Sequence, residues 1–140
     1  MAKSKHAKYI VTDLKAPAFT PEFNERYKTF AKRILWMDDN VVPGSFQMNC
    51  SWYCKPNSSH LGAGSHQHKE SEIIGFFSSD PEKPYDLGAE IEFWLEDEKF
   101  ILTKSFMIYI PANVEHCPLV FRRMDAPMFH MTLGSADKYV

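Results

Sequence analysis

The feature of this sequence that most limits its fold is the strict alternation of residue types at positions 46–54. The even positions carry large apolar side chains or cysteine: Phe46, Met48, Cys50, Trp52 and Cys54. The odd positions carry polar side chains and one tyrosine: Gln47, Asn49, Ser51 and Tyr53. Successive side chains of a β-strand point to opposite faces, so this alternation predicts a β-strand over these residues.

Other short segments continue the pattern along the chain. The further strands are expected at residues 33–37, 90–95, 100–103, 106–110, 119–123 and 127–133. Turn-forming residues separate them at intervals of about ten residues, which is typical of an all-β sandwich or barrel. The sequence therefore predicts an all-β fold.

One short helix is expected before these strands. Thr20 is suited to the N-cap position and Pro21 to the first helical position. Aromatic residues at helical spacing extend the predicted helix to about Lys32. Upstream of the helix, residues 9–11 predict a short strand within an N-terminal arm.

The whole chain is expected to form one domain. We assign residues 1–45 to the N-terminal arm and helix, residues 46–133 to the barrel and residues 134–140 to a tail. A chain of 140 residues can bury one core, and we find no internal repeat or linker in it. Because unpaired sheet edges favour association, we expect a homodimer in which the arm takes part.

The composition argues against several classes of partner. The formal net charge of −2 argues against nucleic acid as the main partner. No apolar run is long enough to cross a membrane, and no apolar signal core follows the basic N-terminus. The 3 cysteines are odd in number and include no Cys-x-x-Cys pair, so a disulfide framework is not expected. These observations predict a cytoplasmic protein with free thiols.

The candidate functional residues are centred on His66 and His68. A strand is predicted over residues 64–77, and in a strand these two imidazoles and the carboxylate of Glu72 project to the same side. Imidazole and carboxylate groups that converge in this way are ligands for a divalent metal ion.

Two more residues bear on this site. His116 follows Pro111 by five residues at the end of an apolar strand, and it can complete the ligand set. Glu70 has the same parity as Glu72, so alternation alone does not choose between the two acids.

With these motifs the chain resembles a small single-domain cupin over residues 47–132. The residues that match the two motifs of that family are His66, His68, Glu72, Pro111 and His116. The resemblance implies a jelly-roll (cupin) β-barrel in which the three histidines and Glu72 hold one divalent transition metal: Fe, Mn, Zn, Ni, Co or Cu. The spacing of the family motif favours Glu72 over Glu70.

The chain also departs from the family pattern. Ser105 and Asn113 stand where the second motif has glycines, although asparagine tolerates the left-handed conformation nearly as well. Residues 78–88 resemble an insertion that could form one lip of the pocket.

The remaining candidates are weaker. His130, in the last strand, is a candidate general base or substrate contact. Arg122 is a candidate for binding a substrate carboxylate through its planar fork. Trp52 and Tyr53 are candidates for the wall of a substrate pocket. For each, a purely structural or solvated role is the alternative. Cys117 directly follows a metal candidate and by alternation faces away from the metal.

A site with three imidazoles and one carboxylate leaves coordination positions open, which is typical of a catalytic metal. The leading hypothesis is therefore a metal-dependent enzyme that acts on a small organic carbonyl, hydroxy or carboxylate compound. Isomerase, lyase, hydrolase and dioxygenase chemistry all remain open. The alternative is a non-catalytic barrel that binds a small ligand with the help of the metal.

Overall fold

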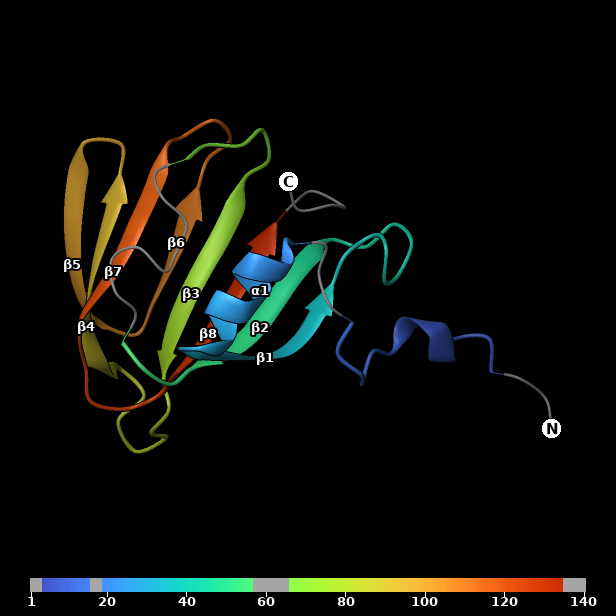
Figure 1. Cartoon of the computed structure of the whole chain (residues 1–140), viewed down its shortest axis with the longest axis horizontal. Helices are drawn as coiled ribbons and strands as arrows, with labels where there is room; N and C mark the ends of the chain where they lie inside the picture. Colours follow the sequence, from blue (N-terminus) through green and yellow to red (C-terminus); the bar gives the residue numbers. More distant parts are fainter. Residues whose placement is uncertain (1–3, 16–18, 57–65, 135–140) are drawn as a thin grey trace.

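The computed structural model describes residues 4–15, 19–56 and 66–134. Within them, two antiparallel sheets pack against each other (Figure 1), with strand orders β1-β2-β8-β3-β6 and β5-β4-β7. The elements are a 3-10 helix (Ala7–Tyr9), α1 (Pro21–Lys28), β1 (Ala31–Met37), β2 (Gln47–Tyr53), β3 (Glu72–Ser78), β4 (Asp86–Leu95), β5 (Glu98–Lys104), β6 (Phe106–Ile110), β7 (His116–Met124) and β8 (Met128–Gly134). The predicted all-β jelly-roll with one short α-helix is confirmed.

Helix α1 begins where predicted but ends earlier. The hydroxyl of Thr20 accepts a hydrogen bond from the N–H of Phe23 at 3.2 Å, so the predicted N-cap is present. The predicted extension to Lys32 is wrong, because the backbone there already belongs to β1 and pairs with β2. Immediately before β1, the carbonyl of Phe30 accepts the N–H of Cys54 at 2.8 Å. Among the described residues, no helix is long and apolar enough to span a membrane.

The N-terminal arm is not a strand. The prediction for residues 9–11 is wrong: a single 3-10 turn ends at Tyr9, and Ile10 is 71% exposed. A strand requires a partner for its backbone groups, and the arm extends away from the barrel (Figure 1).

The segment that carries the first two candidate histidines is also not a regular strand. Instead of the strand predicted over residues 64–77, β3 begins only at Glu72. Upstream of it, His66 forms an isolated bridge with His116 at the start of β7. The glycine-rich residues 61–64 before His66 lie outside the described residues.

Strand β2 turns its polar side chains inward. Gln47, Asn49 and Ser51 are at most 5% exposed, whereas Met48 and Trp52 are 37% and 36% exposed. Strand β2 pairs with β1 on one side and β8 on the other, so its inner face lines the barrel. The alternation therefore places amide and hydroxyl groups inside, where burial is costly unless they are hydrogen-bonded.

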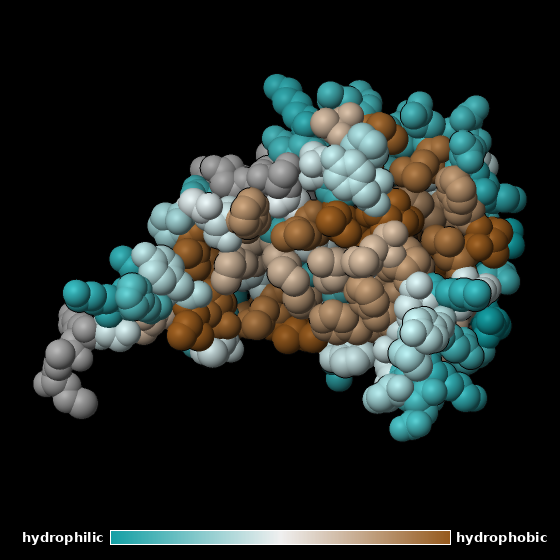
Figure 2. Space-filling model, turned by 180° about the vertical axis from the view of Figure 1, so that it is seen from behind, coloured by the Kyte–Doolittle hydropathy of each residue, from teal (hydrophilic) through white to brown (hydrophobic). Residues whose placement is uncertain are grey.

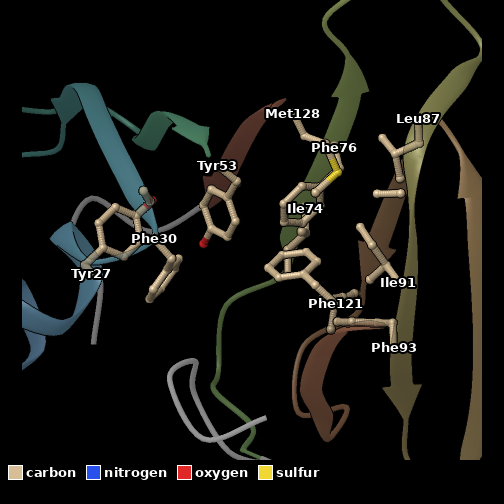
Figure 3. Packing of buried hydrophobic residues seen from close by; sticks show 13 residues of the cluster. Tyr27, Phe30, Tyr53, Ile74, Phe76, Leu87, Ile91, Phe93, Phe121 and Met128 are labelled. Carbon is tan, nitrogen blue, oxygen red and sulfur yellow. The ribbon is translucent and has the colours of Figure 1, made fainter. Parts of the chain in front are cut away.

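The apolar part of the interior lies between β3, β4 and β7 (Figure 3). Leu87, Ile91 and Phe93 of β4 face Phe76 and Phe121, and all five side chains are at most 5% exposed. Burying a side chain of this size contributes about 1.5–3 kcal/mol. Aromatic side chains from α1 and β2 continue this cluster towards the polar inner face of β2 (Figure 3).

Candidate metal centre

Three histidines from two distant parts of the sequence meet at one end of the barrel. One ligand atom from each of His66, His68 and His116 lies within 4.8 Å of the others. Two backbone hydrogen bonds hold the segments together: the N–H of His66 donates to the carbonyl of His116 at 3.0 Å, and the reverse bond is 2.9 Å long. The carbonyl of His68 likewise accepts the N–H of Asn113 at 2.8 Å. The cluster therefore depends on backbone pairing rather than on a continuous strand.

Backbone carbonyls orient two of the imidazoles. Nδ1 of His68 lies 2.9 Å from the carbonyl oxygen of Glu70, and Nδ1 of His116 lies 2.9 Å from that of Val114. A carbonyl only accepts hydrogen bonds, so each Nδ1 carries the proton and donates it. In a neutral ring, Nε2 is then the unprotonated nitrogen, which is the usual arrangement of a metal-binding histidine.

The carboxylate of Glu72 faces these nitrogens. It is 4% exposed, and its Oε2 lies 2.8 Å from Nε2 of His68 and 3.5 Å from Nε2 of His116. Glu70 instead contributes its backbone carbonyl to His68. Of the two acids that alternation left open, the structure therefore places Glu72 beside the histidines.

The imidazole nitrogens and the carboxylate of Glu72 bring hydrogen-bond acceptor atoms close together, and not every one of them faces a donor. Nε2 of His116 is buried and has no hydrogen-bond partner among the described residues. Burial lowers the pKa of His116, but contacts with Glu72 and the Val114 carbonyl outweigh that effect, and the net pKa of His116 is raised. A lone pair and a carboxylate oxygen at short distance require a proton or a cation between them. The donor set of three imidazoles and one carboxylate fits a divalent transition metal.

A cavity of about 130 Å³ adjoins the cluster. His66, Glu72 and His116 line it, and so do Tyr53 and His130. Aromatic side chains from α1 and β1 complete the wall. The chain therefore combines a set of metal-type ligands with an adjoining space for a small molecule.

His130 is held as a neutral imidazole. It is 5% exposed, and its Nδ1 donates a hydrogen bond to the carbonyl of Gly75 at 3.0 Å. Burial lowers the pKa of His130 to about 3. A nitrogen with so low a pKa is a weak base at neutral pH, so a substrate contact suits His130 better than the role of general base.

Two predicted substrate residues lie away from this cavity. Trp52 points to the outer face of the sheet, where its ring packs edge-on against Phe129 at 5.5 Å. Arg122 is 42% exposed and forms ion pairs with Glu90 and Glu92. Neither Trp52 nor Arg122 is among the described residues that line the cavity, because pairing partners decide which face of a strand is internal, and parity alone cannot.

Two smaller expectations also fail. Cys117 lines the cavity instead of facing away, because its φ of +74° and a register shift between β4 and β7 interrupt the alternation. Burial raises the pKa of Cys117 to about 12, so its thiol stays protonated at neutral pH. The expected insertion is shorter than residues 78–88, since β4 already begins at Asp86. None of residues 79–85 is among the described residues that line the cavity.

The sequence interpretation missed four polar residues that line the cavity: Arg33, Gln47, Asn49 and Thr132. For the two residues of β2, a signal was available. An alternating strand with polar side chains on one face and aromatic side chains on the other has two possible orientations, and the polar face can line a binding cavity. Arg33 carried no such signal, because β1 was expected only as a short apolar strand.

Comparisons with known proteins identify the fold. No protein-family model matches the sequence, and no curated protein matches it. An oxalate oxidase in complex with glycolate is 12% identical, with a TM-score of 0.54 over 94% of this chain and 61% of that chain. A sugar phosphate isomerase from a cupin superfamily, from Silicibacter pomeroyi, is 10% identical, with a TM-score of 0.54 over 91% of this chain and 70% of that chain. The chain has the cupin fold, and it spans less than two thirds of the length of the oxalate oxidase.

Proposed function

We propose that this cupin-fold protein is a metal-dependent enzyme that acts on a small organic compound with carbonyl, hydroxy or carboxylate groups. The observation that carries the proposal is the buried Nε2 of His116, which has no hydrogen-bond partner among the described residues and faces the carboxylate of Glu72. His66, His68, Glu72 and His116 would hold one divalent ion of Fe, Mn, Zn, Ni, Co or Cu.

The bound metal would supply Lewis-acid chemistry, and with a redox-active ion also oxygen chemistry. The chain's own residues bind and orient the substrate. The cavity beside the histidines is lined by aromatic rings, and His130 offers a neutral imidazole to it. These features are common to isomerase, lyase, hydrolase and dioxygenase sites, so the proposal extends to all four classes. The solved relatives with this fold include an oxalate oxidase and a sugar phosphate isomerase.

Metal analysis tests the proposal. Purified protein incubated with Zn²⁺, Mn²⁺ or Fe²⁺ and then desalted should retain about one metal ion per chain. The double variant His66→Ala, His68→Ala should retain almost none while keeping its far-ultraviolet circular dichroism. His6→Ala removes an exposed histidine of the arm and is the matched control. Full metal retention by the double variant would contradict the proposed ligand set.

A non-catalytic ligand-binding barrel is the alternative that the same ligand set allows. The two functions differ in turnover. A metal-loaded enzyme would consume oxygen with a catechol or diketone, or convert a hydroxy or oxo acid without oxygen. A binding protein would retain the metal and bind small anions but release them unchanged.

We also propose that the protein is a cytoplasmic homodimer. All three cysteines are free, which suits a reducing compartment. The outer face of the larger sheet is apolar (Figure 2), and on it Phe46 and Tyr109 are 68% and 62% exposed. These rings border a shallow pocket lined by Ile73 and Leu133. Protruding rings beside a pocket on one surface suit a two-fold interface, where each copy inserts into the other.

A further inference from the structure

The cavity contains an arginine for which no ion pair is found among the described residues. Arg33 of β1 is half-buried and lines the same cavity as His66 and Glu72. Its guanidinium carbon lies 4.2 Å from the centre of the Tyr27 ring and 5.4 Å from that of Trp36. These stacking contacts fix the plane of the guanidinium without using its N–H donors.

Most of those donors have no acceptor within the described part of the chain. The one side-chain hydrogen bond found for Arg33 there goes to Oδ1 of Asn49, and no ion pair is found. Asp38 is buried nearby in the sequence, but its oxygens accept from the indole of Trp36 and from the backbone N–H of Asn40. A guanidinium has five N–H donors, so Arg33 can still bind a carboxylate in bidentate fashion.

The charge of the cavity also favours binding of an anion. Glu72 is the one acidic residue among the described residues that line it. A divalent ion bound by Glu72 and three neutral imidazoles leaves a net positive charge, and Arg33 adds another. A low-dielectric cavity with this balance favours an anion over a neutral molecule.

Gln47 supplies a second, independent observation. It is 1% exposed and lines the cavity, and its Nε2 donates to the hydroxyl of Thr132 at 3.3 Å. Its Oε1 has no hydrogen-bond partner among the described residues. A buried carbonyl without a partner is unfavourable, and a hydroxyl of a bound ligand would supply the missing hydrogen bond.

The register of the sheet places these groups along one wall. Gln47 and Asn49 are two residues apart on the inner face of β2, about 7 Å along the strand, and Arg33 is bonded to Asn49. Across the sheet, Gln47 of β2 pairs with Gly134 of β8, and Gly134 pairs in turn with Glu72 of β3. Because Gly134 has no side chain, the space between the amide and the metal ligands stays open.

We infer that the ligand of this cavity is a small hydroxy-carboxylate whose carboxylate is bound by Arg33 and whose hydroxyl donates to Gln47. The separation along β2 suits an extended chain of about four carbons. This inference rests on the proposed function for the role of the ligand as substrate, but the recognition of the carboxylate belongs to Arg33 and not to the metal.

The test uses three probes that differ in one group each: 4-hydroxybutanoate, butanoate and 1,4-butanediol. Their dissociation constants are measured by ligand-observed NMR titration, with chelator-treated protein and with Zn²⁺-loaded protein. Arg33→Met should weaken binding of both carboxylates by about 10–100-fold, the worth of a charge-assisted hydrogen bond, and leave the diol unchanged. Arg33→Lys, which keeps the charge but not the fork, should fall between wild type and Arg33→Met.

Matched variants separate recognition from folding. Arg26→Met makes the same substitution on the exposed face of α1 and should bind all three probes as wild type does. Gln47→Met keeps the side-chain length and should abolish the preference for 4-hydroxybutanoate over butanoate. If Arg33→Met does not fold, the Arg33→Lys comparison and the Gln47→Met comparison still decide the matter.

The two proposals fail separately. Both proposals are supported if the double variant His66→Ala, His68→Ala loses the metal but still binds butanoate in a way that depends on Arg33. The wild type could instead fail to retain metal but still bind butanoate, with binding lost in Arg33→Met. That result would reject the metalloenzyme and keep this inference. Two results would overturn the inference. One is equal affinity of wild type and Arg33→Lys for butanoate. The other is binding of butanoate that requires Zn²⁺ and is unaffected by substitution of Arg33.

Discussion

His130 should make the protein progressively less stable in acid. Its imidazole is packed against the rings of Tyr53 and Phe76, with centroids 4.7 Å and 4.3 Å away. Burial lowers the pKa of His130 to about 3, the Gly75 carbonyl opposes this shift, and the positive charge of Arg33 adds to it. In the unfolded chain, a histidine has a pKa of about 6.5.

The direction and size of the effect follow from proton linkage. Between about pH 6.5 and pH 3 the unfolded state binds a proton that the folded state does not, so the free energy of unfolding falls as the pH falls. The slope approaches about 1.4 kcal/mol per pH unit, and the loss between pH 7 and pH 5 amounts to about 2 kcal/mol. Above about pH 7, His130 contributes no pH dependence.

The variant His130→Asn isolates this contribution. Asparagine can still donate to the Gly75 carbonyl but does not titrate. Urea unfolding of wild type and variant is compared at pH 7, 6 and 5, with chelator present so that release of metal does not enter. The variant should lose about 2 kcal/mol less than wild type between pH 7 and pH 5.

A second variant keeps this prediction falsifiable. His130→Phe loses both the titrating group and the hydrogen bond to Gly75, so it should be less stable than wild type at pH 7. Its free energy of unfolding should show the same shallow pH dependence as that of His130→Asn. Stability curves of wild type and both variants that run parallel from pH 7 to pH 5 would refute the reasoning, because a buried neutral histidine could not then be present.

Two further predictions concern the backbone and the surface. Gly88 has a φ of +67°, so Gly88→Ala should lower the free energy of unfolding by about 1–2 kcal/mol in urea titrations, and an unchanged midpoint would contradict the strain argument. Tyr109→Glu should convert the proposed dimer to a monomer of 16.2 kDa in size-exclusion chromatography with light scattering, whereas Tyr85→Glu, at a tyrosine that is even more exposed, should not. A wild type that elutes as a monomer would reject the dimer.

Local sequence patterns were sufficient for the all-β class, for β2 and for the start of α1. The alternation at residues 46–54 predicts β2, and Thr20 predicts the start of α1, because strand pleating and helix capping depend on near neighbours alone. The residue types at His66, His68, Glu72 and His116 suggested metal ligands, and the structure brings their side chains together. Binding of a metal by them stays a prediction.

Tertiary structure alone decided which faces and which neighbours these residues have. Strand β2 pairs with β1 and β8 and buries its polar face, so Tyr53 lines the cavity whereas Trp52 lies on the outer face. Arg33 enters the cavity because it pairs with Ser51 of β2, which belongs to the buried face of that strand. Periodicity tells which side chains share a face, but pairing across the sheet decides which face is internal, and pairing depends on residues far away in the sequence.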